Sequence, residues 1–205
     1  MHSSPSNGST ALAAFMGASL ILALSYTAGT FSTDYFILSY EDAIKAIDMN
    51  VIFLLMGMMM IVGILKKTGL FQWIAYKSYQ VARGNVYALS TILMVVTAVA
   101  SAFLDNVTTM LLIITVTIEI ALTLRINPIA LLMPEVFASN VGGTATLIGD
   151  PPNIMIGSYA KLSFLDFVQN LSAVCAVGMV ITVVYFLFWY RKEYAGAKLG
   201  NVQAT

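Results

Sequence analysis

Two short polar clusters interrupt otherwise apolar stretches of the 205-residue chain, at residues 105–109 and 140–153. They supply carboxylate, amide and hydroxyl oxygens, and a broken helix would add free backbone carbonyls. Such oxygens suit a hard cation such as Na⁺. The N–H groups at the start of a half-helix carry partial positive charge and suit an anion. The two clusters are therefore predicted to hold an ion, or a cation and an anionic substrate side by side.

The predicted binding residues either carry oxygen or leave the backbone open to a ligand. They are Asp105, Asn106, Thr108, Thr109, Asn140, Gly142, Gly143, Thr144, Thr146, Asp150 and Asn153. An aspartate here could instead take a proton, because burial disfavours its charged form. No metal site is predicted beyond Na⁺ at this same cluster.

Two residues beside the second cluster could support the site. Glu135 and Ser139 are four positions apart and therefore share a helix face. Two readings of Glu135 stay open, because it could support the site or face water at a helix end.

Composition excludes several classes of protein. The chain is 59% apolar and only 10% charged, with a mean hydropathy of +0.86, whereas a soluble domain is about half apolar and a quarter charged. The low share of charged residues makes the lipid bilayer the expected surrounding. The charges of ten basic and ten acidic residues cancel, so no nucleic-acid partner is expected. The lone Cys175 excludes an internal disulfide, and the lone His2 excludes histidine catalysis.

Long apolar stretches must position the clusters, and they have the length of membrane helices. They cover residues 11–30, 48–65, 86–104, 107–124 and 171–190. Eighteen residues at 1.5 Å each reach about 27 Å, close to a hydrocarbon core of about 30 Å. Residues 68–83 mix aromatic, aliphatic and charged side chains, which is typical of an amphipathic helix in the membrane interface. The predicted fold class is an all-α membrane protein.

Residues 128–160 are predicted to form one span that is broken in its middle. The expected interruptions are Gly142, Gly143, Gly149, Pro151 and Pro152, so that residues 140–153 are not ordinary helix. The pieces, about 12 and about 9 residues, reach about 18 Å and 14 Å. Only together do they cross the core. A merely kinked helix, or a loop, is the alternative.

Residues 86–127 form either a re-entrant hairpin or two full spans. Their hydroxyls favour a hairpin buried in protein, whereas between two full spans Asp105 and Asn106 would form a solvated turn. Most basic residues fall on one side in either case, and that side is expected to be cytoplasmic. These residues are Lys66, Lys67, Lys77, Arg83, Arg125, Arg191, Lys192 and Lys198.

The expected organisation follows the chain in seven parts. They are a polar tail (1–10), scaffold helices (11–67), an interfacial amphipathic helix (68–85), the re-entrant hairpin (86–127), the broken helix (128–160), a connector with the last transmembrane helix (161–190) and a flexible linker (191–205).

Both clusters resemble the ion transporter superfamily, at residues 103–110 (FLDNVTTM) and 138–153 (ASNVGGTATLIGDPPN). The resemblance is greatest to the branch with arsenical permeases, NhaD-type sodium–proton antiporters and the P protein, which has a citrate-transporter-like domain. Citrate and dicarboxylate carriers are more distant relatives. The resemblance covers about residues 48–194.

The resemblance implies a secondary transporter built from two inverted repeats, each with a re-entrant hairpin and a broken helix that meet near the membrane midplane. It implies that residues 105–109 are the hairpin tip and residues 140–153 the break in the partner helix. It also implies an inorganic ion or small anion as substrate (the Na⁺/H⁺, arsenite or carboxylate class), moved by alternating access. No enzymatic activity and no cofactor are expected, and Na⁺ or H⁺ is the candidate coupling ion.

Each motif occurs once, so the chain is expected to be the first half of a carrier that pairs with a second transporter half, with a homodimer as a further expectation. The cell or inner membrane is expected, with an organelle membrane as the alternative. Two rival functions stay open. One is an intramembrane aspartyl protease using Asp105 and Asp150, although Leu147 stands where its motif needs glycine. The other is a non-transporting membrane assembly partner.

Overall fold

The computed structural model describes residues 5–30 and 39–196, and every regular element in those ranges is an α-helix. The chain divides into two units, residues 1–49 and residues 50–205. This composition of helices confirms the all-α fold class. The expected polar tail (1–10) and the end of the expected linker (197–205) lie wholly or partly outside the described residues.

The first unit contains α1 (Pro5–Gly29) and α2 (Tyr40–Lys45). Ser39 caps α2, because its hydroxyl accepts a hydrogen bond from the Asp42 N–H at 3.0 Å. The Tyr40 N–H donates to the Tyr26 hydroxyl at 3.2 Å and so joins the start of α2 to α1. The expected helix over residues 11–30 is present within α1, which has 25 residues.

Four helices of the described chain are long and apolar enough to cross a membrane. They are α3 (Met49–Lys67), α5 (Val86–Phe103), α6 (Asn106–Thr123) and α9 (Phe164–Trp189). Most side chains of α3 are exposed, whereas α5 and α6 bury one face. Large apolar side chains exposed on such long helices are suited to lipid rather than water. The chain is therefore an integral membrane protein.

The amphipathic segment forms α4 (Leu70–Ala82), which packs against α5 and α6. Phe71, Ala75, Ser78 and Ala82 are buried at helical spacing. Trp73 lies on the exposed side. The predicted amphipathic pattern therefore buries one face on the helices that carry the first polar cluster.

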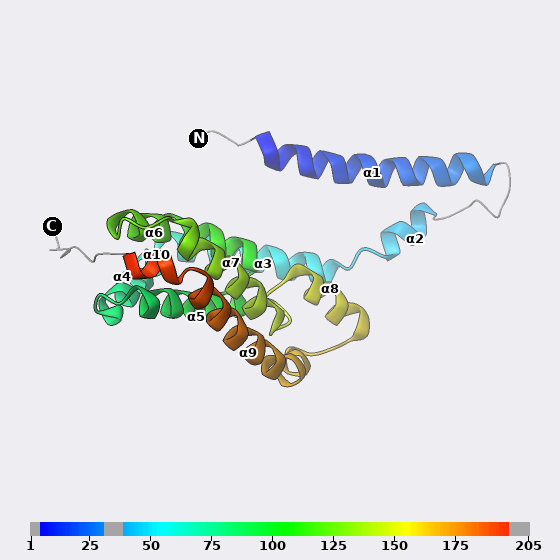
Figure 1. The fold of residues 1–205 in the computed structure, drawn as a ribbon. Helices are drawn as coiled ribbons and strands as arrows, with labels where there is room; N and C mark the ends of the chain where they lie inside the picture. Colours follow the sequence, from blue (N-terminus) through cyan, green and yellow to red (C-terminus); the bar gives the residue numbers. More distant parts are fainter. Residues whose placement is uncertain (1–4, 31–38, 197–205) are drawn as a thin grey trace. The chain divides into compact units, whose positions relative to one another are not determined.

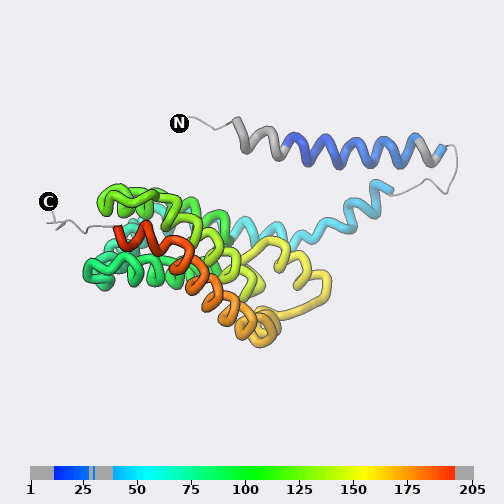
Figure 2. Tube along the Cα trace, viewed as in Figure 1, coloured from blue at the N-terminus to red at the C-terminus, as the bar shows by residue number. Residues whose placement is uncertain are grey.

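The broken helix is present, but the break is shorter than predicted. The first piece, α7 (Ile129–Thr144), continues as helix through Asn140, Gly142 and Gly143, so the expectation that these residues leave the helix is wrong. Only residues 145–150 are non-helical, and α8 (Pro151–Ala160) follows, with Pro151 as its first residue. Figure 2 traces the chain from α7 through this segment into α8 and on to α9.

The corrected lengths keep the two-piece reading. With 16 residues α7 reaches about 24 Å, and with 10 residues α8 reaches about 15 Å. Each is shorter than a hydrocarbon core of about 30 Å. The arithmetic therefore still favours one interrupted span.

The C-terminal part of the described chain is more helical than predicted. α9 begins at Phe164, inside the expected connector, because Ser163 and Asp166 form a reciprocal capping box at its start. The expected flexible linker begins instead with α10 (Arg191–Gly196), whose Tyr194 is buried. The predicted start of the last span at Leu171 is therefore wrong, whereas its predicted end at Tyr190 agrees with the end of α9 at Trp189 to within one residue.

The second unit is centred on α5, beside which α7 and α9 lie in Figure 1. A buried cluster joins α5, α6, α7 and α10 through apolar side chains that include Leu89, Leu93, Leu124 and Leu131. This packing joins the first half of α5 and the end of α6 to the start of α7, and α7 meets the end of α5 again at Ser139 and Gly142.

Candidate ion-binding site

Three glycines allow α5, α7 and the break to approach one another closely. A Cβ atom on Gly142 would lie 2.5 Å from the Cα of Ala98 in α5. One on Gly143 would lie 2.6 Å from the Gly149 carbonyl oxygen, and one on Gly149 would lie 2.7 Å from the carbonyl oxygen of Ser101. Real Cβ atoms do not make such contacts, so only glycine fits. The predicted break residues Gly142 and Gly143 thus serve helix packing.

Two hydroxyls bind the last turn of α5 to the second polar cluster. Ser101 Oγ donates to the Ser139 carbonyl oxygen at 2.7 Å. Thr146 Oγ1 donates to the Ala102 carbonyl oxygen at 2.5 Å. These bonds lie on either side of the glycine contact, so the end of α5 and the second cluster are held together at several levels.

The first polar cluster begins at the turn between α5 and α6, at Asp105, and continues into the first turn of α6. Asp105 is only 8% exposed and caps α6, because its carboxylate accepts a hydrogen bond from the Thr108 N–H at 2.8 Å and another from the Thr108 hydroxyl. The Thr109 hydroxyl is buried and has no hydrogen-bond partner in the described part of the chain. The first cluster therefore combines a nearly buried carboxylate, at Asp105, with a fully buried hydroxyl that lacks a hydrogen-bond partner within the described ranges, at Thr109.

One hydrogen bond joins the two clusters directly. Asn106 Nδ2 donates to Asn140 Oδ1 at 2.8 Å, between residues 34 positions apart in the chain. The second amide group also bonds its own helix, because Asn140 Nδ2 donates to the Val136 carbonyl oxygen at 2.8 Å. The predicted convergence of the two clusters is confirmed at this pair.

The non-helical segment is closed by its own polar groups. Asn153 Nδ2 donates to the Thr146 carbonyl oxygen at 2.9 Å and to the Thr144 carbonyl oxygen at 3.3 Å. The Gly149 N–H donates to Thr146 Oγ1 at 3.1 Å, and Thr144 Oγ1 donates to the Asn140 carbonyl oxygen at 2.8 Å. Two carbonyl groups at the break, those of Thr144 and Thr146, are thus both bonded by the Asn153 amide.

Asp150 is the last residue of the break before α8. It is half-buried and occupies the N-cap position of α8, but its side chain makes no capping hydrogen bond. Among the described residues the carboxylate of Asp105 bonds Thr108, and no hydrogen bond joins it to Asp150. An aspartyl protease needs two carboxylates that share a proton, and no such hydrogen bond joins Asp105 and Asp150 in the described chain.

The two supporting residues have different surroundings. The Ser139 carbonyl oxygen accepts the hydrogen bond from Ser101. Ser139 therefore takes part in the close contact of the end of α5 with α7 and the break, which we call the crossing. Glu135 is 1% exposed and accepts hydrogen bonds from Thr117 Oγ1 on both carboxylate oxygens at 3.0 Å. The alternative in which Glu135 faces water is therefore wrong, because its side chain is buried between helices.

Ser101 and Thr117 were not singled out as site residues by the sequence. Both are hydroxyl residues inside long apolar helices, and this was the only available signal. It was weak because several other hydroxyls occur in the same helices.

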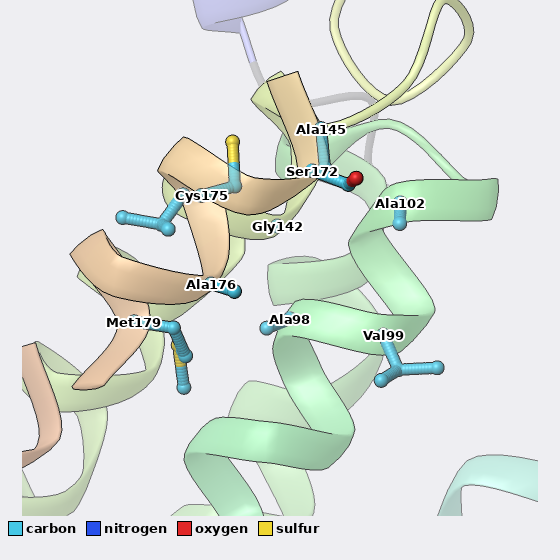
Figure 3. A pocket seen from close by; sticks show the side chains of 10 residues that line it. Ala98, Val99, Ala102, Gly142, Ala145, Ser172, Cys175, Ala176 and Met179 are labelled. Atoms are coloured by element: carbon cyan, nitrogen blue, oxygen red, sulfur yellow. The ribbon is translucent and has the colours of Figure 1, made fainter. Parts of the chain in front are cut away.

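An apolar pocket of about 200 Å³ lies beside the crossing. It is an open pocket lined by α5, α7 and α9, and Figure 3 shows Ala176 and Met179 of α9 opposite Ala98 of α5. Gly142 forms part of its wall. α9 therefore packs less tightly on α5 and α7 than those two helices pack on each other.

Comparison with known proteins identifies similar sequences. A family model described as a citrate transporter matches residues 8–199. An uncharacterized transporter of Mycobacterium tuberculosis is 49% identical over 137 residues, which are 67% of this chain and 32% of that protein. The 46 kDa membrane protein of Mycobacterium leprae is 44% identical over 184 residues, or 90% of this chain and 41% of that protein. The human P protein is 41% identical over 163 residues, or 76% and 20%.

The chain thus spans between a fifth and about two fifths of the length of these relatives. The family match extends over both units and includes both polar clusters.

Proposed function

Because the chain belongs to the citrate transporter family, we propose that it forms the first half of an ion-coupled secondary transporter. In this proposal the clusters at 105–109 and 140–153 form one half of the binding site for an inorganic ion or a small anion. The chain supplies binding groups and a moving body, and no chemical step.

The observation that carries the proposal is the hydrogen bond between Asn106 and Asn140 at 2.8 Å. It brings together two polar stretches that lie within apolar sequence. Polar groups at membrane depth are costly, so they occur mainly where they serve a function. The amide oxygens, the Asp105 carboxylate and the carbonyls of the break are ligands of the type that Na⁺ prefers. The start of α8 adds no free N–H group for an anion, because Pro151 and Pro152 lack one and the Asn153 and Ile154 N–H groups donate to the Asp150 carbonyl oxygen.

The close packing of the crossing suggests how the site moves. The α5–α6 turn and the α7–α8 break are bound by hydroxyl–carbonyl bonds and by contacts that only glycine permits. We expect them to move as one body, with the turn acting as the tip of a re-entrant hairpin. The looser contact with α9, where the 200 Å³ pocket lies, is where we expect sliding to occur.

Sidedness and assembly follow from the same proposal. The side bearing Lys66, Lys67 and Arg125 is expected to be cytoplasmic by the charge rule. A second transporter half is the expected partner, since a complete site in this proposal needs an inverted copy of the same elements.

The test is flux into proteoliposomes that contain the full-length protein. Radiolabelled citrate, arsenite and Na⁺ are offered in turn, with an imposed Na⁺ or pH gradient. We expect uptake of one of them, and we expect Asp105→Ala and Asn140→Ala each to abolish it while still inserting into the membrane. Thr115→Ala removes an exposed hydroxyl of α6 and is the matched control.

Wild-type flux in both variants would remove these residues from the site. Retained flux in Asn140→Ala alone would confine the site to the turn between α5 and α6.

A further inference from the structure

A buried carboxylate in the middle of α7 is not used by the proposed ion site. Glu135 is 1% exposed, and its two oxygens each accept a hydrogen bond from the hydroxyl of Thr117 in α6. Thr117 is itself fully buried. A single hydroxyl is thus the only hydrogen-bond donor to this carboxylate in the described part of the chain.

No basic side chain faces Glu135 from the helices packed against α7. These helices are α5, α6 and α9, and neither they nor α7 contain lysine, arginine or histidine. The acidic residues of α6 and α9, Glu119 and Asp166, are exposed. The charged residues of α10 are exposed as well, and Arg191 lies over the ring of Phe188 at 4.6 Å.

Tyrosines are the remaining titratable groups around α7. Tyr194 of α10 is 3% exposed, and its hydroxyl donates to the Ala130 carbonyl oxygen at 2.6 Å, less than two turns before Glu135. Tyr87 of α5 packs edge to face against it, with ring centroids 5.4 Å apart. Tyr185 of α9 is exposed, and Cys175 of α9 lines the pocket beside Gly142. A phenol or a thiol is never positively charged, so none of these groups can balance a negative charge.

An ionised carboxylate with one hydroxyl partner and no cation is unfavourable in such an interior. A metal ion would need several oxygen ligands, and the contacts seen here offer only the two carboxylate oxygens and Thr117 Oγ1. A proton needs only one oxygen. Neutralisation by a proton is therefore the simplest arrangement that satisfies these groups.

We infer that Glu135 is a proton-binding site, distinct from the ion site, whose carboxyl takes up and releases one proton during the transport cycle. This inference rests on the proposed function. In the step, the carboxylate binds a proton from water on one side of the membrane, and the resulting carboxylic acid later returns it to water on the other side. Thr117 donates to the carboxylate form and can accept from the acid form.

The position along α7 fits this role. Glu135 lies six residues after Ile129, about 9 Å along the helix, and five residues before Asn140, about 8 Å. It therefore lies between the α6–α7 connection and the contact that joins the two polar clusters. Tyr194, bonded to Ala130 and to Ser90, lies near the start of α7.

The test is infrared spectroscopy of the purified full-length protein at neutral pH. A protonated carboxyl gives a C=O stretching band that an ionised one lacks. We expect this band in the wild type, its loss in Glu135→Gln and its retention in Glu119→Gln, a matched change at an exposed position of α6. We also expect the band to disappear when the wild type is titrated to alkaline pH.

Several outcomes would overturn the inference. They are a missing band at neutral pH, an unchanged band in Glu135→Gln, or a band seen only in Na⁺-free buffer, which would identify a cation ligand. If Glu135→Gln fails to fold, Thr117→Val tests the same point. This change removes the hydroxyl that stabilises the carboxylate, so the band of the protonated carboxyl should persist to higher pH than in the wild type. An unchanged titration would contradict the assignment.

The infrared result does not depend on flux, so its failure is separable from failure of the proposed function. Where flux is measured, we expect the wild type to depend on pH and Glu135→Gln to lose that dependence. A pH dependence that survives in Glu135→Gln would count against the inference even if the band is present.

Discussion

Two glycine-containing helices of the second unit, α3 and α7, use the same residue in opposite ways. In α3 a Cβ atom added at Gly57 or Gly63 would meet nothing within 4 Å. In α7 a Cβ atom added at Gly142 would overlap the backbone of Ala98. Small residues in an apolar helix therefore do not by themselves indicate close packing. What matters is whether another backbone lies against them.

The polar groups of the two helices differ in the same way. α3 is apolar over most of its length and exposes most of its side chains. α7 carries Glu135, Ser139 and Asn140, which bond to α6, α5 and the α5–α6 turn respectively. The helix that approaches its neighbours most closely is thus also the one that carries the polar contacts.

The largest effect is expected from Gly142→Ala. The added methyl group must displace the backbone of α5, and overpacking of this kind costs about 1–3 kcal/mol or more. We expect a lower unfolding temperature in detergent and loss of flux. Unchanged stability would show that α5 and α7 can separate freely, which would remove the contrast with α3.

A smaller effect is expected from Tyr194→Phe, which tests a third close contact. The change removes a buried hydroxyl that bonds the Ala130 carbonyl oxygen at 2.6 Å and Ser90 Oγ at 3.0 Å. Leaving such partners unbonded costs about 1–3 kcal/mol. Unfolding free energy at neutral pH measures it, and an unchanged value would mean that α10 is only loosely docked.

The same tyrosine predicts a dependence on alkaline pH. Burial raises the pKa of Tyr194 to about 12, whereas a tyrosine in the unfolded chain titrates near about 10. The unfolded state therefore loses its proton first, and stability falls as the pH rises from about 10 to about 12. Tyr194→Phe should lack this part of the decline, as unfolding curves at several pH values would show.

Ser101→Ala should weaken the crossing without crowding it. The change removes the hydrogen bond from Ser101 to the Ser139 carbonyl oxygen, worth about 1 kcal/mol. Thermal unfolding measures the loss, and Thr115→Ala on the exposed face of α6 is the control. Equal effects of the two changes would mean that the crossing depends on glycine packing alone.

The smallest effect, and one of opposite sign, is expected from Gly57→Ala in α3. Alanine favours a helix over glycine by about 0.5–1 kcal/mol, and space is open at this position. We expect stability to be unchanged or slightly raised. A destabilised protein would show that another surface packs closely on α3, as α5 does on α7.

Much of the fold was predictable from the chain because it depends on local patterns. The apolar stretches gave helices close to α3, α5 and α6, and the amphipathic stretch gave α4. The convergence of Asn106 and Asn140 was also predictable, since polar groups within apolar sequence need polar neighbours. The capping box at Ser163 was visible in the sequence and would have corrected the start of α9.

Other features depended on contacts between distant residues. Gly142 and Gly143 stay helical because α5 and the break press against them, and Tyr194 orders α10 through groups some 60 and 100 positions away. A sequence pattern reports local conformational preference, and glycine is compatible with both a helix interior and a break. The length of the break and the presence of α10 were therefore mispredicted.

The sequence alone determined that the chain is a helical membrane protein with two polar clusters, because apolar length and the cost of buried polarity act along the chain itself. Only the tertiary structure decided which glycines touch a backbone, which hydroxyls bond across helices and whether Glu135 meets water. Those outcomes depend on which faces meet when helices pack, and the residues that meet are far apart in the chain.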